Sequence, residues 1–482
     1  MAEPTASSDV DRDPWSYVPP APLTVEETGV PEPFLRELVL KVLWAHDRPP
    51  VTAISQATGL HVRVAEVLVE GLCREALCEI DGGTSQSGIH FRYRLTDRGK
   101  AAAHEALERS RYIGVAPVPV AAYNRMIDDQ IKRFKRPPLD EIRTAVEHLV
   151  LPERLVEVLG QAFFSRRALM IYGPSGNGKT DIVTSIARIV AGTVVIPYSI
   201  YGHGQLIRVY DPDVHKPQVG VEKKGGGRSE QDADSQSPNG QGDEADVSDA
   251  EALEAVEASA GLWADKSFRH DRRWLPVKRP NVIVGGDMGS EALEMTYDAT
   301  QGVHNAPLSV VAQGGVLVID DLGRQRIAPK EILNRWVLMM EQGYDSFSLS
   351  TSEVVRLPLD VTLVFSTNLT IQDLMDEAYL RRIAYKIAIP NPTREQLAEI
   401  TRRFCIQREL EWSEDAIQYL MQRLYASDLV EPHGCYPRDI VTTITDEAEF
   451  QGRTPVLTRE SIDAALSLYL GEEPVDQEAF AA

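Results

Sequence analysis

Short apolar runs alternate with longer segments of helical periodicity through the middle of the chain. Six such runs are found at Ala168–Tyr172, Thr193–Pro197, Val282–Val284, Val316–Ile319, Thr362–Phe365 and Lys386–Ile389. Runs of this length between helical stretches are typical of the buried strands of a parallel sheet that carries helices on both faces. We therefore predict a three-layer α/β domain over residues 139–390.

Three polar segments depart from this pattern. Residues 216–264 consist mainly of Gly, Ser, Gln, Asp and Glu, so we expect a flexible acidic insert in the α/β domain. Residues 1–33 are rich in Pro, Asp and Ser without periodicity and are predicted to form a disordered acidic tail. Residues 472–482 are predicted to form a second acidic tail.

A smaller unit precedes the α/β domain. Its first helix has an apolar face made by Leu35, Leu38, Val39, Val42 and Leu43, and a second helix is expected at about 61–78. A glycine turn at 82–83 and a period-two segment at 89–95 follow, and then a third helix. This order resembles a winged helix-turn-helix domain over 34–112. A proline-stiffened linker is expected at 113–138, and the helical periodicity after residue 390 predicts a separate all-α domain at 391–471.

The composition, 43% hydrophobic and 25% charged, is that of an ordinary globular chain of 482 residues. The net charge of −22 lies almost entirely in the polar segments: residues 1–33 carry −6, residues 229–258 carry −10 and residues 472–482 carry −4. The rest of the chain is nearly neutral. The acidity therefore belongs to tails and insert and does not exclude a nucleic-acid partner.

Membrane and secretion signals are not evident. No run of 18 apolar residues occurs, so we expect no membrane insertion, and the N-terminus lacks the basic start and apolar core of a secretory signal. Four cysteines are too few for a disulfide framework. We expect a cytoplasmic protein.

The most specific motif follows the first apolar run. Its residues are Gly173, Pro174, Ser175, Gly176, Asn177, Gly178, Lys179 and Thr180, in the pattern G-x-x-x-x-G-K-T. Glycines let backbone N–H groups surround a polyphosphate, and the helix that follows adds its positive N-terminal dipole. We predict that this loop binds the phosphates of ATP, with Lys179 reaching the β- and γ-phosphates and Thr180 ligating Mg²⁺. The alternative is a chance loop that binds nothing.

A second anchor for Mg²⁺ is expected on a neighbouring strand. The apolar run Val316–Ile319 ends in Asp320 and Asp321. Asp320 suits the magnesium shell, and Asp321 is placed to orient or deprotonate the attacking water.

The order of these motifs and of three later ones resembles an AAA+ ATPase over about residues 140–470. The later motifs are Phe365-Ser366-Thr367-Asn368, the segment 376–383, and Gly434–Asp439. The resemblance implies that Asn368 acts as sensor 1, that Arg381 or Arg382, with Arg382 favoured, is the arginine finger, and that Arg438 in a helical lid is sensor 2. It also implies a homo-oligomeric ring such as a hexamer. The alternatives are a turn-capping Asn368, solvated arginines at 381 and 382, and an Arg438 that pairs with Asp439 or another acid of the lid.

Two departures from the family pattern affect the expected activity. The strand ends Asp-Asp where the family usually has Asp-Glu. The side chain of Asp321 is one methylene shorter than glutamate, so its carboxylate is expected about 1.5 Å further from the attacking water, which can cost on the order of 10²-fold in rate. Lys179 and Asp320 are also 141 residues apart, which predicts extra structure besides the acidic insert. No clear aromatic pore loop is present.

The side chains expected on the surface of the N-terminal unit indicate whether it contacts DNA or protein. In the second helix we expect Val64, Val67, Leu68 and Leu72 to face inward and Arg63, Glu66, Glu70 and Arg74 to face outward. The two glutamates would repel DNA phosphates, although His90, Arg92 and Arg94 form a basic strip on the wing. We favour a protein contact and leave a DNA contact open.

Three functions follow from this sequence. The first is an AAA+ ATPase that hydrolyses Mg-ATP in a ring and remodels a protein partner. The second is a DNA-associated regulatory ATPase that acts through its winged helix. The third is a nucleotide-sensing scaffold with weak hydrolysis, because Asp321 is a shortened base.

Overall fold

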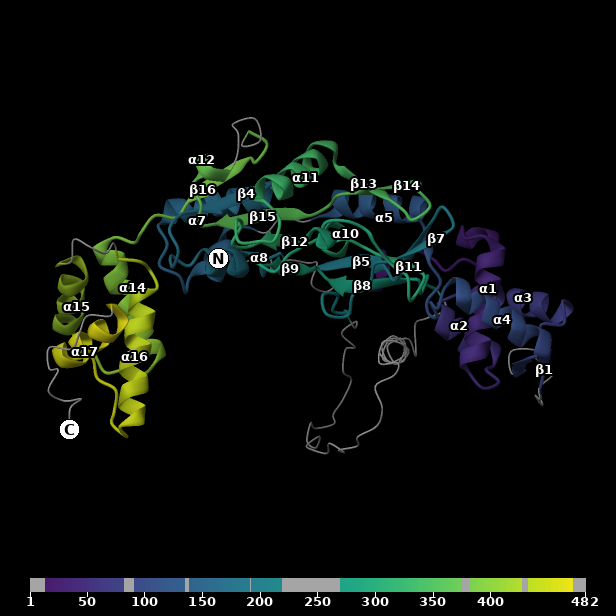
Figure 1. Cartoon of the computed structure of the whole chain (residues 1–482), viewed down its shortest axis with the longest axis horizontal. Coiled ribbons are helices and arrows are strands. Elements are labelled where there is room, and N and C mark those ends of the chain that lie inside the picture. Colours follow the sequence, from purple (N-terminus) through teal and green to yellow (C-terminus); the bar gives the residue numbers. More distant parts are fainter. Residues whose placement is uncertain are drawn as a thin grey trace, which may run out of the picture.

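The computed structural model describes residues 14–81, 91–134, 138–190, 192–218, 269–374, 381–426 and 432–470. Three parts follow one another along the long axis of the molecule (Figure 1). Helices α1–α4 lie at one end, the α/β region with further β-structure lies in the middle, and helices α14–α17 lie at the other end. The predicted acidic insert after residue 218 and the predicted tail at 472–482 lie outside the described residues.

A five-stranded parallel sheet forms the centre. Its strand order is β16-β4-β15-β12-β9, with all neighbours parallel. The strands are β4 (Leu169–Tyr172), β9 (Asn281–Val284), β12 (Val316–Ile319), β15 (Thr362–Thr367) and β16 (Tyr385–Ala388). Because the strands are parallel, the residues that follow β4, β12 and β15 meet at one edge of the sheet.

Helices cover both faces of this sheet, as predicted. Side chains alternate along each strand, so Ile171 and Val318 pack on the face covered by α6 (Leu139–Val146), α7 (Glu153–Ser165) and α8 (Lys179–Ala187). Met170 and Leu317 point to the opposite face, where they pack with α11 (Pro329–Gln342). The domain is therefore a three-layer α/β fold.

One predicted strand of this sheet lies elsewhere. The segment Thr193–Pro197 forms β5, which pairs antiparallel with β8 (Trp274–Lys278) in a separate two-stranded sheet. The apolar residues of this run are buried, as expected for a strand of the central sheet. The sheet that the run joins is determined by its pairing with β8, a strand that follows the acidic insert in the sequence. The prediction that this run belongs to the central sheet was wrong.

The structure contains further β-strands, and those between residues 193 and 305 contribute to the long separation between Lys179 and Asp320. A second five-stranded sheet has the order β10-β11-β7-β6-β3, and β13 pairs with β14. These strands are β3 (Val118–Pro119), β6 (Ser199–Gly202), β7 (Gln205–Arg208), β10 (Thr296–Asp298), β11 (Val303–Asn305), β13 (Tyr344–Ser348) and β14 (Val354–Pro358). Strands β3, β6, β7, β13 and β14 share a core with α5 (Val120–Arg133), and Val310 of the short helix α10 (Leu308–Val311) belongs to the same core. The short helices η5 (Ser290–Ala292) and α12 (Ile371–Leu374) instead pack into the core on one face of the central sheet.

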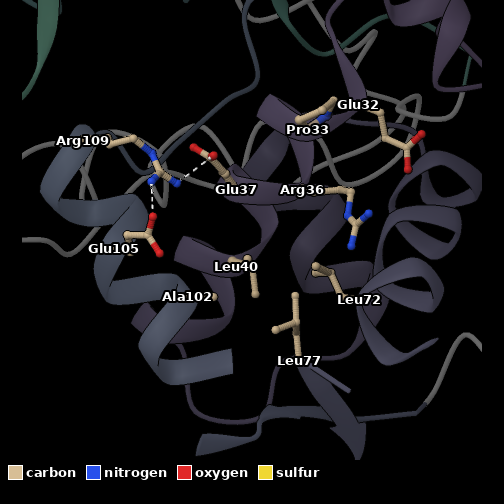
Figure 2. A pocket seen from close by; sticks show the side chains of 10 residues that line it. All are labelled: Glu32, Pro33, Arg36, Glu37, Leu40, Leu72, Leu77, Ala102, Glu105 and Arg109. Carbon is tan, nitrogen blue, oxygen red and sulfur yellow. Dashed lines mark hydrogen bonds and ion pairs between the residues drawn. The ribbon is translucent and has the colours of Figure 1, made fainter. Parts of the chain in front are cut away.

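The N-terminal part is built from four helices and a small sheet. The helices are α1 (Glu32–Ala45), α2 (Val51–Thr58), α3 (Val62–Arg74) and α4 (Asp97–Arg109), and β1 (Cys78–Ile80) pairs antiparallel with β2 (Tyr93–Leu95). Residues 82–90, which include His90 of the predicted wing, lie outside the described residues. A cavity of about 420 Å³ with Leu40, Leu72 and Leu77 in its lining lies among these helices (Figure 2). At its rim Arg109 pairs with Glu37 and Glu105, each at 2.8 Å.

One expected core position of α3 was wrong. Val67 is 50% exposed, because the buried stripe of this helix is formed by Val64, Ala65, Leu68, Val69 and Leu72. Position 67 therefore falls on the outer face, beside Arg63 and Glu70.

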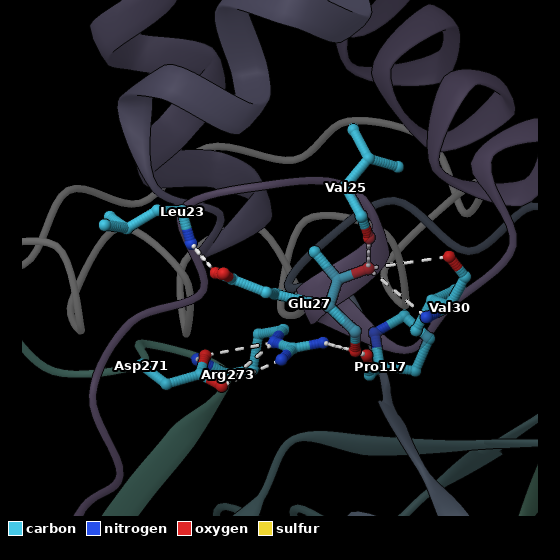
Figure 3. A network of polar contacts seen from close by, with 8 residues as sticks. Leu23, Val25, Glu27, Val30, Pro117, Asp271 and Arg273 are labelled. Atoms are coloured by element: carbon cyan, nitrogen blue, oxygen red, sulfur yellow. Dashed lines mark hydrogen bonds and ion pairs between the residues drawn. The ribbon is translucent and has the colours of Figure 1, made fainter.

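The predicted disorder of residues 1–33 was wrong for residues 14–33. This segment contains the short helices η1 (Pro14–Tyr17) and η2 (Glu26–Thr28) and buries Val18, Val25 and Val30. It is held by Arg273, which donates hydrogen bonds to the carbonyl oxygens of Thr28 and Pro117 and pairs with Asp271 (Figure 3). The contacts are with residues far away in sequence, so local periodicity does not reveal them.

In the described residues after 390, the C-terminal part is a bundle of four helices, namely α14 (Arg394–Gln407), α15 (Glu414–Ala426), α16 (Tyr436–Phe450) and α17 (Arg459–Leu470). They bury a common core that includes Leu397, Ile417, Ile440 and Ile462. A capping box between Thr393 and Gln396 fixes the start of α14 just after the end of the sheet. None of the helices in the described part of the chain has both the length and the apolar character that a membrane span requires.

Candidate nucleotide-binding site

The loop at 173–178 connects β4 to α8 and depends on glycine at three positions. Gly173, Gly176 and Gly178 all have positive φ, at 143°, 80° and 72°. A Cβ atom on Gly173 would lie 2.2 Å from the carbonyl oxygen of Ile389, so the backbone of the loop passes directly against the end of the sheet. The loop therefore has the conformation that only glycines allow, with α8 beginning at Lys179.

Lys179 lies inside this loop. Its Nζ donates hydrogen bonds to the carbonyl oxygens of Gly173 (3.0 Å) and Pro174 (2.7 Å) and to Oδ1 of Asn368 (2.6 Å). Burial lowers the pKa of Lys179, and the nearby Asp321 and Asp320 carboxylates oppose that shift. The ammonium is thus a desolvated donor between the loop and the acidic end of β12.

The two acids after β12 point to different neighbours. Oδ2 of Asp320 accepts a hydrogen bond from the Thr180 hydroxyl at 2.6 Å, which joins the first turn of α8 to β12. Asp321 has a φ of 48°, in the left-handed region that aspartate tolerates better than most residues. The chain therefore turns sharply after the strand, and Oδ1 of Asp321 accepts a hydrogen bond from Nδ2 of Asn368 at 2.9 Å.

Strand order explains why Asn368 connects the two halves of the site. Strand β15 lies between β4 and β12, and Asn368 is the first residue after β15. Its amide oxygen therefore faces Lys179 and its amide nitrogen faces Asp321. Residues far apart in sequence meet across a single intervening strand.

The predicted arginines lie in different surroundings. Arg382 pairs with Glu341 of α11, with Nε 2.5 Å from Oε1, and Arg381 is exposed. Arg438 lies in the first turn of α16, where its Nε donates to Asp439 at 2.8 Å. The hydrogen bond with Asp439 is the main cause that raises the pKa of Arg438, and the charge of Asp181 on α8 contributes to the same shift. The ion pairs of Arg382 and Arg438 thus lead to acids outside the cluster around Lys179.

Two residues of the site, Gln325 and Asn391, were not predicted from the sequence, and the contact of Asn177 and Gly434 was not predicted either. Gln325 organises the turn after β12, because its Nε2 donates to the Asp320 carbonyl and its Oε1 accepts from the Gly323 N–H. Asn177, Asn391 and Gly434 form a contact between the loop and the C-terminal bundle. Polar side chains of this kind carry no sequence signal until their neighbours are known.

The residues present fit a magnesium-bound nucleotide. Among the residues that the structure describes, no group of three or more His, Cys, Asp or Glu side chains could hold a metal ion. Mg²⁺ in nucleotide sites does not need such a cage, because it uses one or two protein oxygens together with waters and phosphate oxygens. Thr180 and Asp320 supply two oxygen donors 2.6 Å apart, next to a loop that only glycines can form.

Residues 393–468, which span the C-terminal bundle, match a family model described as "Domain of unknown function (DUF8689)". No curated protein matches the chain.

Solved structures with some likeness include NtrX from Brucella abortus, at 15% identity and a TM-score of 0.36 over 80% of this chain and 64% of that one. The chain thus spans less than two thirds of that protein. NtrX in complex with ADP gives 13% identity and a TM-score of 0.36 over 76% of this chain and 67% of that one. The Holliday junction branch migration motor RuvB from Thermotoga maritima has 12% sequence identity and a TM-score of 0.34. The match covers 66% of this chain and 69% of that one.

Proposed function

We propose that this chain is an ATPase of the AAA+ type that binds Mg-ATP at 173–180 and couples its hydrolysis to the remodelling of a protein partner. The observation that carries the proposal is the junction of Lys179, Thr180, Asp320, Asp321 and Asn368 by three side-chain hydrogen bonds of 2.6 to 2.9 Å. A phosphate loop and an acidic strand end are each common, but their meeting at one sheet edge is what phosphoryl transfer requires.

Each residue of this junction has a defined role in the proposal. The loop N–H groups and Lys179 would hold the phosphates, and Thr180 and Asp320 would hold the metal, which would neutralise phosphate charge. Asp321 would orient or deprotonate the attacking water, and Asn368 would hold the Asp321 carboxylate in place through the 2.9 Å hydrogen bond. Arg382 and Arg438 would contribute charge from a neighbouring subunit and from the lid, so we propose a homo-oligomeric ring.

The outer face of α3 favours a protein partner over DNA. It presents Val67 at 50% exposure between Arg63 and Glu70. An apolar side chain next to an acid suits a protein surface, whereas a helix that reads DNA needs positive charge toward the phosphates.

Nucleotide binding and turnover test the proposal. Lys179→Ala should weaken Mg-ATP binding at least about tenfold, because it removes a charge-assisted donor to phosphate. Asp321→Asn keeps the size of the side chain and should bind ATP but lose about 10²-fold or more in turnover. Lys132→Ala, which removes an exposed lysine on α5, is the matched control and should behave as wild type.

The same assay separates the alternatives. Turnover per subunit that rises with protein concentration supports a ring, and stimulation by duplex DNA would favour the DNA-associated function. Tight ATP binding without turnover, not improved in Asp321→Glu, would favour a sensing scaffold. Wild-type protein without magnesium-dependent affinity for ATP would overturn the proposal.

A further inference from the structure

The phosphate-binding loop is joined to the C-terminal bundle by the side chain of Asn177. Oδ1 of Asn177 accepts a hydrogen bond from the backbone N–H of Gly434 at 2.9 Å. Nδ2 of Asn177 donates to Oδ1 of Asn391 at 2.8 Å. Asn391 lies in the short connection between β16 and α14, and Gly434 lies just before α16. One side chain of the loop therefore contacts both the connection that leads into the bundle and the start of one of its helices.

Glycines allow this contact to be close. A Cβ atom on Gly176 would lie 2.6 Å from Sγ of Cys435, and one on Gly434 would lie 3.2 Å from the carbonyl oxygen of Gly176. The turn at 433–435 thus packs directly on the backbone of the loop. Glycine at position 176 therefore allows both the positive φ of the loop and the close approach of the turn at 433–435.

The backbone N–H of Gly434 can only donate a hydrogen bond, and this fixes the orientation of the side-chain amides of Asn177 and Asn391. The Gly434 N–H requires an acceptor, so Oδ1 of Asn177 faces it and Nδ2 faces Asn391. Asn391 must then present its own Oδ1, which lies 3.0 Å from Nδ1 of His433 as well. The three side chains form one connected network with a defined direction.

This network lies immediately before the helix that carries Arg438. Residues 433–435 lead directly into α16, and Arg438 is its third residue. Asp439 accepts the hydrogen bond from Arg438, and its other carboxylate oxygen accepts one from the Tyr469 hydroxyl at 3.1 Å. A displacement of the turn at 433–435 would therefore move the first turn of α16 and Arg438 with it.

We propose that Asn177 is a positioning residue that couples the phosphate-binding loop to the bundle and sets the place of Arg438 during ATP hydrolysis. This inference rests on the proposed function. The hydrogen bonds to Gly434 and Asn391 are made by the side chain of Asn177, whereas phosphate binding by the loop uses backbone N–H groups. Loss of the side chain should therefore affect turnover more than nucleotide affinity.

Two measurements on the full-length chain test the coupling. In Asn177→Ala, hydrogen exchange at the Gly434 amide should become faster in the nucleotide-free protein, because the amide loses its acceptor. The kcat for ATP should fall about tenfold, the effect of losing roughly one positioned hydrogen bond in the transition state, with little change in the dissociation constant of Mg-ADP. Asn177→Asp keeps the acceptor for Gly434 and should retain its slow exchange.

A double-mutant cycle tests the route through Arg438. If Asn177 acts by placing Arg438, Asn177→Ala should reduce kcat no further when Arg438→Ala is already present. Asn124→Ala is the matched control: Asn124 is also partly buried, and its amide donates one hydrogen bond to the Arg356 carbonyl away from the site. This control should leave exchange at Gly434 and kcat unchanged.

Each result decides between the two proposals. Unchanged exchange at Gly434 in Asn177→Ala, or unchanged kcat in an active enzyme, would overturn the coupling and leave the ATPase proposal intact. Full additivity with Arg438→Ala would overturn the role of Asn177 in placing Arg438. A wild-type protein that does not bind Mg-ATP would overturn the proposed function and, with it, the kinetic role of Asn177.

Discussion

Removal of the Asp271 carboxylate should destabilise the junction between the N-terminal part and the rest of the chain. The side chains of Asp271 and Arg273 are each 4% exposed, and Nη2 of Arg273 lies 2.8 Å from Oδ2 of Asp271. Nε of Arg273 also donates to both carboxylate oxygens, at 3.0 and 3.2 Å. The same guanidinium uses Nη1 to hold the carbonyl oxygens of Thr28 and Pro117 (Figure 3).

The magnitude follows from what Asp271→Ala leaves behind. The guanidinium would stay buried with its two carbonyl partners but without a counter-charge. Removal of one partner of a buried ion pair costs about 3–5 kcal/mol, a large part of the roughly 5–15 kcal/mol that stabilises a typical domain. Asp271→Asn keeps the shape and one acceptor, so we expect a smaller loss.

The assay must resolve local from global unfolding, because a chain of several domains need not unfold in one step. Urea unfolding can be monitored by hydrogen exchange in the peptides that cover residues 23–30 and 114–119, which belong to this junction. Asp129→Ala is the control, since it removes an exposed partner of Lys132, 3.6 Å away, and should cost less than about 0.5 kcal/mol. Equal unfolding midpoints and equal exchange in Asp271→Ala and the control would refute the reasoning.

Three further predictions concern the loop and a buried lysine. Gly176→Ala should lower the melting temperature of the nucleotide-free protein more than Gly178→Ala, because both have positive φ but only at Gly176 would a Cβ meet a neighbour, the Cys435 sulfur; equal melting temperatures would contradict this. Gly173→Ala should destabilise the end of β4 and weaken nucleotide binding, since its Cβ would lie 2.2 Å from the Ile389 carbonyl oxygen, and unchanged ADP affinity in a titration would count against the close approach. Burial lowers the pKa of Lys41 from 10.5 to about 8, so between these values the unfolded chain binds more protons and the free energy of unfolding should rise with pH. Lys41→Met should be more stable than wild type at pH 7 and lack that rise, and urea unfolding at about pH 7 and about pH 9.5 measures both effects.

The local parts of the candidate site could be predicted from sequence. The loop pattern at 173–180 predicts its own conformation, because glycines at positive φ and a following helix are local properties of the chain. The acids after β12 could be placed at the same edge because parallel strands bring their carboxyl ends together. Asn368 was also predicted near the site, and the strand order shows why it contacts Lys179 and Asp321 at once.

Other features depend on contacts between distant segments. A short apolar run indicates a buried strand but cannot reveal which sheet that strand joins, so Thr193–Pro197 was assigned to the central sheet although it pairs with β8. Residues 14–33 have no periodicity, and they are ordered by contacts with residues such as Arg273 that are far away in sequence.

The sequence by itself thus determined the conformation of the glycine-rich loop at 173–178, the acidic strand end and the α/β character of the middle of the chain, because these depend on backbone conformation and on short-range patterns of burial. Only the tertiary structure decided that Asn177 meets Asn391 and Gly434 and that Asp271 and Arg273 anchor the N-terminal segment. Hydrogen bonds and ion pairs of this kind form between residues whose proximity is set by the packing of whole elements, and no local pattern encodes that packing.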